Sequence, residues 1–212
     1  MNFLTFQKYF SALPVISISE IEKYFPGFDP NALTRWQKAG YIEKIRNGFY
    51  RIDGKSLDGG ETALFIIANR IYAPSYISLQ SALSWYGFIP EGVFTVTSVS
   101  SLKTNAFTTP IGHFSYRTLK PSLFWGYSLE SSGAYHFRIA HPAKALLDFF
   151  YLFPEIGTDD QFYELRLNPF ELKERLQPGI LKQYAARFKS KSLEIRVDKF
   201  LNFLTQAHDI LI

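Results

Sequence analysis

Four polar residues, spaced three, one and three positions apart, are the strongest candidates in this sequence for a binding site. The four are Asn31, Thr34, Arg35 and Lys38. On a helix, at about 100° per residue, they fall within roughly a quarter-turn of one another. Amide, hydroxyl, guanidinium and ammonium groups can bond base edges in the major groove of DNA, and also phosphates. The spacing predicts a face that reads nucleic acid, with Gln37, nearer the apolar side, as a weaker member.

A short helix must position this face. Asp29 can accept hydrogen bonds from the first turn, and Pro30 fits the first helical position. Gly40 follows the last helical residue, where a positive φ costs little only without a Cβ. Leu33 and Trp36 define the opposite, apolar side of the helix.

A two-stranded ribbon is expected immediately after this helix. Segments Tyr41–Ile45 and Phe49–Ile52 flank Arg46-Asn47-Gly48, and Asn-Gly is a strong hairpin signal. We expect the polar residues of the hairpin to contact phosphates or the minor groove. These are Lys44, Arg46, Asn47 and Arg51.

Two shorter helices are expected before the polar one, over Asn2–Ser11 and Glu20–Phe25, the second capped by Ser17 or Ser19. A solvated amphipathic helix also places polar residues on one face, so one such helix indicates little. Three helices followed by a basic hairpin are more specific. They predict a winged helix-turn-helix DNA-binding domain over residues 1–58.

The remainder, residues 59–212, predicts a larger mixed α+β domain with a helical C-terminus, so the whole chain belongs to the α+β class. Helices are expected at 61–72, at 79–86 with Ser78 as cap, and at 143–153. Strands are expected at 76–78, 93–99, 111–119, 124–129 and 134–139. The last third is helical in pattern, with breaks at Asn168-Pro169 and Gln177-Pro178-Gly179.

Composition narrows the class of protein. The 212 residues are 47% hydrophobic and 17% aromatic, which is ample material for packed cores. The net charge of +4 is compatible with nucleic-acid binding but modest for a dedicated binder. The absence of Cys excludes disulfides and thiolate metal sites. No run approaches the ~20 apolar residues of a membrane span, so we expect a cytoplasmic protein with no membrane partner.

Catalytic patterns are sparse. The histidines are His113, His136, His141 and His208, and no HExxH, GxxxxGK[ST] or GxGxxG motif occurs. Asp148 lies seven residues after His141 on an apolar helix, where we expect a structural carboxylate bonded to backbone or to a Tyr. We therefore expect no catalytic residues, metal or cofactor. An enzyme centred on His136, His141 and Asp148 is the rival hypothesis, and it requires those side chains to converge.

A basic run without acidic residues occurs near the C-terminus. Its members are Lys182, Arg187, Lys189 and Lys191. Such a run is usually a solvated helix face. The alternative is a patch for an acidic partner, either protein or nucleic acid.

Several segments, taken in order, resemble the AbiEi-type antitoxins, the transcriptional regulators of type IV toxin–antitoxin (abortive infection) systems. The first is LTRWQKAGYIEKIRNGFYRI at 33–52, which includes Gly48-Phe49-Tyr50. The next are Tyr76-Ile77-Ser78, Ser81-Ala82-Leu83 and Tyr86-Gly87, followed by the strand at 93–99. The last is Ile139-Ala140 with the segment HPAKALLD at 141–148.

The resemblance implies a winged helix that binds double-stranded operator DNA and represses its own operon. It also implies a C-terminal domain that neutralises a nucleotidyltransferase-like toxin without requiring a stable complex. The alternative is a ligand-responsive regulator without a toxin partner, which would have an enclosed apolar pocket within residues 61–160.

Overall fold

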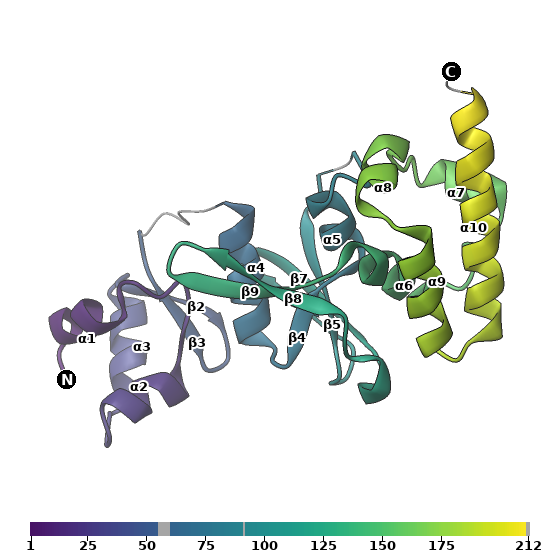
Figure 1. The fold of residues 1–212 in the computed structure, drawn as a ribbon. Coiled ribbons are helices and arrows are strands. Elements are labelled where there is room, and N and C mark those ends of the chain that lie inside the picture. The colour runs from purple at the N-terminus through teal and green to yellow at the C-terminus, as the bar shows by residue number, and fades with distance from the viewer. Residues whose placement is uncertain (55–59, 91, 211–212) are drawn as a thin grey trace.

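The computed structural model describes residues 1–54, 60–90 and 92–210. It is a mixed α+β structure, which confirms the expected fold class. Residues 1–54, here the N-terminal unit, lie at one end of an elongated molecule, and the C-terminal helix lies at the other (Figure 1). The expected domain boundary at residue 58 falls outside the described residues.

The N-terminal unit alternates short helices with a small sheet. Its elements are α1 (Phe3–Phe10), β1 (Ile16–Ser17), α2 (Ile18–Tyr24), α3 (Asn31–Lys38), β2 (Ile42–Arg46) and β3 (Phe49–Ile52). The antiparallel strands are ordered β1-β3-β2. A separate apolar cluster fills the space between helices and sheet, and includes Phe6, Phe10, Ile21, Leu33 and Trp36.

Side-chain caps fix where these helices start and stop. Ser17 and Glu20 form a capping box at the start of α2. The Asp29 carboxylate accepts from the Asn31 N–H at 2.9 Å, although α3 begins one residue later than expected because Pro30 is its N-cap. At the other end Gly40 has φ +72°, and the Tyr41 N–H reaches the Trp36 carbonyl at 2.9 Å. These local hydrogen bonds define the ends of the short helices independently of tertiary packing.

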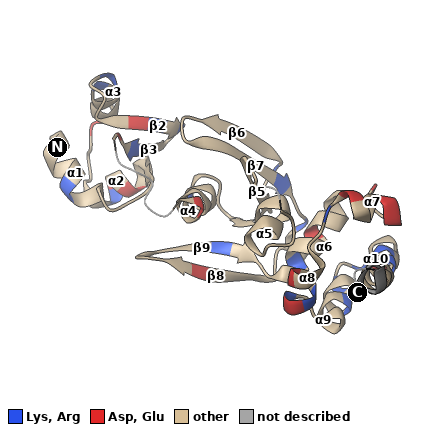
Figure 2. Cartoon of the chain, turned by 90° about the horizontal axis from the view of Figure 1, so that it is seen from above, with Lys and Arg blue, Asp and Glu red and all other residues tan. Residues whose placement is uncertain are grey.

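The C-terminal unit, residues 60–90 and 92–210, is built on a six-stranded mixed sheet with the order β6-β7-β5-β4-β9-β8. Its strands are β4 (Ser75–Ile77), β5 (Thr95–Ser100), β6 (Asn105–Thr109), β7 (Gly112–Thr118), β8 (Tyr127–Ser132) and β9 (Tyr135–Ala140). Helix α4 (Glu61–Ile71) lies between the β6–β7 and β8–β9 hairpins, as Figure 2 shows. The sheet therefore encloses α4 from two sides.

Helices cover the remaining side of the sheet and form the far end of the molecule. They are α5 (Leu79–Trp85), α6 (Pro142–Leu152), α7 (Asp159–Glu164), α8 (Pro169–Arg175), α9 (Pro178–Arg187) and α10 (Lys191–Ile210). The two expected breaks are confirmed, since Asn168 and Gln177 are the N-caps of α8 and α9. Among the described helices, none combines the length and apolar character needed to cross a membrane.

Two strands differ from the sequence-based expectation. Strand β6 was not expected, because its residues Asn-Ala-Phe-Thr-Thr are largely exposed and lack a clear apolar alternation. Strand β8 begins three residues later than expected, because the Phe124 and Trp125 N–H groups bond to the carbonyls of the preceding 3-10 turn at Pro121–Leu123 and Gly126 has φ +75°. Both strands lie at sheet edges, where pairing with one neighbour defines the strand more than its own residues do.

The two units are joined by polar and apolar contacts. The Arg70 guanidinium pairs with the Glu20 carboxylate, and the Tyr135 hydroxyl donates to the Ala12 carbonyl. Val15 and Ile45, although they belong to the N-terminal unit, pack in the large apolar core of the C-terminal unit. The N-terminal unit therefore docks on α4 and its neighbouring strands.

The Glu20–Arg70 pair predicts a pH-dependent stability. Burial acts to raise the pKa of Glu20, but the Ser17 N–H and Arg70 outweigh it, so the pKa lies below its ordinary value of 4.5. A lowered folded-state pKa stabilises the protein above the unfolded pKa, and the effect is lost as pH falls through the folded pKa. Urea denaturation should show Glu20→Gln less stable than wild type by about 0.5–1 kcal/mol at neutral pH.

The difference between the two proteins should shrink as the pH falls through the lowered folded-state pKa of Glu20, because protonation of Glu20 removes its charge from the pair. Glu22→Gln is the matched control, since Glu22 is an exposed carboxylate on the same helix. A Glu20→Gln deficit that persisted unchanged at low pH would contradict the assignment of the stabilisation to the ionised pair.

Candidate functional site

The polar face of α3 is fully presented to solvent. Asn31, Thr34, Arg35, Gln37 and Lys38 are all exposed, as expected from their spacing. The opposite side of the helix is anchored by buried Leu33 and Trp36. The Trp36 ring lies 4.9 Å from that of Phe6 and 5.9 Å from that of Phe28, centroid to centroid. Since both sides follow one 3.6-residue repeat, burying Trp36 fixes the outward direction of the polar face.

Asp29 positions part of this face as well as accepting from the first N–H of the helix. Its second carboxylate oxygen lies 3.2 Å from the Arg35 guanidinium, and the side chains of Asp29 and Arg35 are 52% and 66% exposed. The Asn31 N–H, and then Arg35, hold the pKa of Asp29 below its usual range. Helix α3 lies at the end of the molecule opposite α10 (Figure 2). The Arg35 guanidinium is therefore held over the first turn of an accessible helix.

Strand β2 begins one residue later than expected and strand β3 has the expected bounds, but the polar side chains of the hairpin are less exposed than the sequence suggested. The ladder shifts register between Lys44 and Arg46, and Gly48 has φ +82° in the turn. Asn47 at the tip is exposed, and Lys44 is half-buried. Arg51 is only 12% exposed in its side chain and lies 4.0 Å from the Glu43 carboxylate. Of the expected hairpin contacts, Asn47 and Lys44 are the better placed for an external partner.

The position of Arg46 corrects the expectation that it contacts phosphates. Its guanidinium donates to the Ile71 carbonyl at the end of α4 and lies 4.4 Å from the centre of the Phe107 ring on β6. The rings of Phe49 and Tyr72 are also close, at 5.4 and 5.9 Å. Arg46 thus belongs to the contact between the two units, and no local pattern in the sequence indicates partners 25 and 61 residues away.

The basic run near the C-terminus lies on α9 and the turn into α10, with all four side chains exposed. Lys182 forms an ion pair with Asp198 at 2.8 Å. The Arg187 guanidinium stacks on the Trp125 ring, 3.5 Å from its centre. Lys189 has φ +52° in the turn, and Lys191 begins α10. Of the four residues, Lys182 is paired with Asp198 and Arg187 is packed on Trp125.

The residues of the rival enzymatic hypothesis are not brought together. The exposed His136 ring on β9 bonds the hydroxyl of Ser131 on the edge strand β8 at 3.0 Å. His141 is the N-cap of α6, and Asp148 follows two turns later, about 10 Å along the helix axis. Within the described part of the chain, no group of three potential metal ligands occurs. The side chain of His208 lies outside the described residues.

Asp148 belongs instead to a fully buried polar cluster, together with Tyr76, Ser78 and Lys144. Its carboxylate accepts from the Tyr76 hydroxyl at 2.8 Å and from the Ser78 hydroxyl at 2.9 Å. The Lys144 ammonium bonds the other carboxylate oxygen and donates to Tyr76 at 2.8 Å. The expected bond from Asp148 to a Tyr is confirmed. Ser78 does not cap α5 with its side chain, because that hydroxyl serves the cluster.

Burial governs the protonation of this cluster. It raises the pKa of Asp148 and lowers the pKa of Lys144, and each of these charges opposes the shift of the other. The aromatic rings of Phe188 and Trp125 lie 5.0 and 5.2 Å from the Lys144 ammonium. Because Lys144 and Asp148 have no exposed surface, no external molecule reaches them in this conformation, and the cluster serves the fold.

Substitutions in the cluster should be strongly non-additive. Asp148→Asn leaves Lys144 as an uncompensated buried charge, and Lys144→Met does the same to Asp148, so each should cost about 3–5 kcal/mol of unfolding free energy. The double variant removes both charges, while the amide introduced at position 148 can still accept from Tyr76 and Ser78, so its loss should be well below the sum. Tyr76→Phe, which removes one hydroxyl, should cost about 1–3 kcal/mol. Additive losses in urea denaturation would contradict the pairing.

No known protein-family model matches this chain, and no curated protein has a similar sequence. The resemblance to AbiEi-type antitoxins therefore stays a prediction. A functional proposal depends on the residues and contacts of the chain itself.

Proposed function

We propose that the N-terminal unit is a winged helix-turn-helix domain that binds double-stranded operator DNA through α3. The element order α1-β1-α2-α3-β2-β3, with a small antiparallel sheet, supports this proposal. In it, α2 and α3 form the helix-turn-helix, and the β2–β3 hairpin is the wing. The observation that carries the proposal is the exposed polar face of α3 opposite buried Leu33 and Trp36.

The proposed DNA contacts form two groups, one from α3 in the major groove and one from the hairpin to the DNA backbone. Asn31, Thr34, Arg35 and Lys38 enter the major groove and meet base edges or the flanking phosphates, and Gln37 borders them. Lys44 and Asn47 on the hairpin contact the backbone, with Arg51 in a supporting position behind them. Arg46 is excluded from the interface because it is bound to α4 and β6.

At the level of the whole protein, the proposal is a transcriptional autorepressor and antitoxin. The C-terminal unit counteracts a nucleotidyltransferase-like toxin encoded in the same operon, without requiring a stable complex. The resemblance supports this half of the proposal. The cationic surface formed by Arg187, Lys189 and Lys191 is the natural candidate for contact with an acidic partner.

A ligand-responsive regulator is the second candidate, and a hollow between the C-terminal helices favours it. It was expected to have an enclosed apolar pocket within residues 61–160, but the groove of about 330 Å³ beside β5 and β7 is open, with Arg117, Thr97 and Ser115 among its lining residues. A larger cavity, of about 490 Å³ and mainly apolar, lies outside that range between the C-terminal helices. If a ligand is sensed, this cavity is the better site.

Substitutions on α3 test the DNA-binding proposal. Arg35→Ala and Lys38→Ala should each weaken binding to the DNA upstream of the operon by about 1–3 kcal/mol, with Arg35→Ala also relaxing sequence preference. Lys44→Ala should weaken binding to all sequences alike and lower the salt-dependence slope by about one. Electrophoretic mobility shifts over a salt series measure both effects.

Lys120→Ala is the matched control for these measurements, because Lys120 is an exposed cation in the C-terminal unit. It should bind DNA as wild type does. Unchanged binding by both Arg35→Ala and Lys38→Ala would exclude α3 as the recognition helix.

The two proposed activities should be separable in the full-length chain. The Arg35→Ala/Lys38→Ala double variant should lose repression of an operon reporter and still relieve growth arrest caused by the toxin encoded next to it. The reason is that α3 lies at the opposite end of the molecule from α7, α8, α9 and α10 (Figure 1). Loss of neutralisation at equal protein abundance would show that the antitoxin activity depends on DNA binding.

A further inference from the structure

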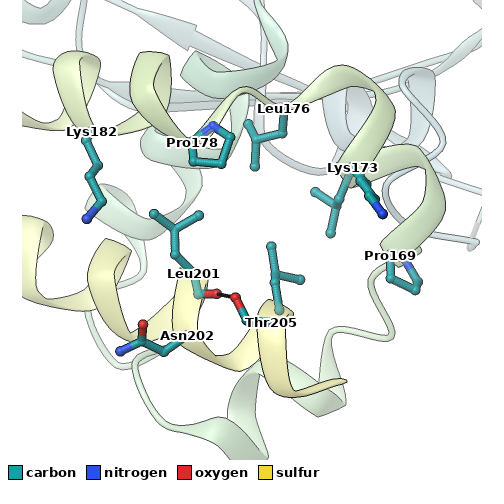
Figure 3. Close-up of a pocket in the computed structure, with 10 residues that line it drawn as sticks. Pro169, Lys173, Leu176, Pro178, Lys182, Leu201, Asn202 and Thr205 are labelled. Atoms are coloured by element: carbon teal, nitrogen blue, oxygen red, sulfur yellow. Dashed lines mark hydrogen bonds between the residues drawn. The ribbon is translucent and has the colours of Figure 1, made fainter. Parts of the chain in front are cut away.

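A cavity of about 490 Å³ lies between α8, α9 and α10. Figure 3 shows Lys173 and Lys182 on opposite sides of it, with Leu176, Leu201 and Pro178 between them. The described residues that line it are Pro169, Leu172, Lys173, Leu176, Pro178, Lys182, Leu201, Asn202, Leu204 and Thr205. Its volume is within the range of ligand-binding pockets, about 300–1,000 Å³.

The sequence explains why the space exists. Pro169 and Pro178 occupy the first turns of α8 and α9, so the chain cannot continue as one helix through this region. The two short helices diverge at residues 176–178, and the long helix α10 spans the gap between them. Leu172 and Leu176 are buried at the floor, whereas Leu201 and Leu204 are only partly buried.

The described residues at the rim of the cavity that carry charge are both lysines. None of its described lining residues is acidic, and Lys173 has no ion-pair partner among the described residues. Lys182 is bonded to Asp198 at 2.8 Å, just outside the cavity, so its charge is partly neutralised. Lys173 is therefore the stronger point of attraction for an anion, and Asn202 and Thr205 add hydrogen-bonding groups at the edge.

We propose that this cavity binds a small molecule with an apolar chain and an anionic headgroup, of which a medium-chain carboxylate is the simplest example. The chain packs against the leucines and prolines, and the carboxylate meets Lys173. The lining favours such a molecule, because its leucines and prolines suit an apolar chain and the Lys173 ammonium suits an anionic headgroup. The site is separate from α3 and does not depend on DNA binding.

Isothermal titration of the full-length protein with decanoate, below its micelle concentration, tests the proposal. Saturable binding at one site is expected, with decyltrimethylammonium, which has the same chain and the opposite charge, binding much more weakly. In the series hexanoate, octanoate, decanoate, each methylene that enters the cavity should tighten binding by up to about fourfold.

Two charge variants should act in opposite directions. Lys173→Gln should weaken decanoate binding by about two- to fivefold, and Asp198→Asn, which frees Lys182, should strengthen it by about twofold. Thr205→Trp should block the cavity from an exposed position on α10 and weaken binding at least tenfold. Lys120→Gln, remote from the cavity, should have no effect.

Several outcomes would overturn the proposal. These are unchanged decanoate binding in Thr205→Trp, equal binding of the cationic amphiphile, or no saturable binding in the chain-length series. If decanoate failed to bind but an acidic amphipathic peptide bound and was blocked by Thr205→Trp, the cavity would instead be a protein-docking groove.

Discussion

The arrangement of the C-terminal unit depends on one buried carboxylate. Asp148 accepts hydrogen bonds from Tyr76 at the centre of the sheet and from Ser78 at the turn into α5, and it pairs with Lys144 one turn earlier on α6. A buried charge is tolerated only when its partners are within hydrogen-bonding distance, so sheet and helices have little freedom to slide. Lys144 extends the constraint to α9, because its ammonium lies against Phe188 and its stem packs on Gly126, where φ is +75° and a Cβ would approach to 3.0 Å.

Local patterns predicted those elements whose ends are set by neighbouring residues. The limits of α3 follow from Asp29 and Gly40, and its buried side follows from the spacing of Leu33 and Trp36. The breaks before α8 and α9 follow from Asn-Pro and Gln-Pro. The polar candidate face could be predicted for the same reason, since it is the complement of a helical apolar stripe.

Features that depend on distant residues were not predictable in this way. Ser78 has the residue type and position of a helix cap, but its hydroxyl is taken by a carboxylate 70 residues later. Arg46 has the charge and place of a phosphate ligand, but a backbone carbonyl and the Phe107 ring occupy it. The mainly apolar cavity between α8, α9 and α10 also required the fold, since its walls come from separate helices that only the tertiary structure brings together. In each case a tertiary contact determines the role of the residues, and the neighbouring sequence does not.

The attachment of Arg46 to the end of α4 has a thermodynamic consequence for the whole molecule. The β2–β3 hairpin follows α3 directly, and Arg46 at the end of β2 attaches it to the C-terminal unit. If the ligand of the N-terminal unit and a ligand of the C-terminal unit both distinguished the attached from the open state, each would change the affinity for the other. Linkage then requires both affinities to change by the same factor. Arg46 would then contribute to this coupling together with the Glu20–Arg70 pair and the packing of Val15 and Ile45.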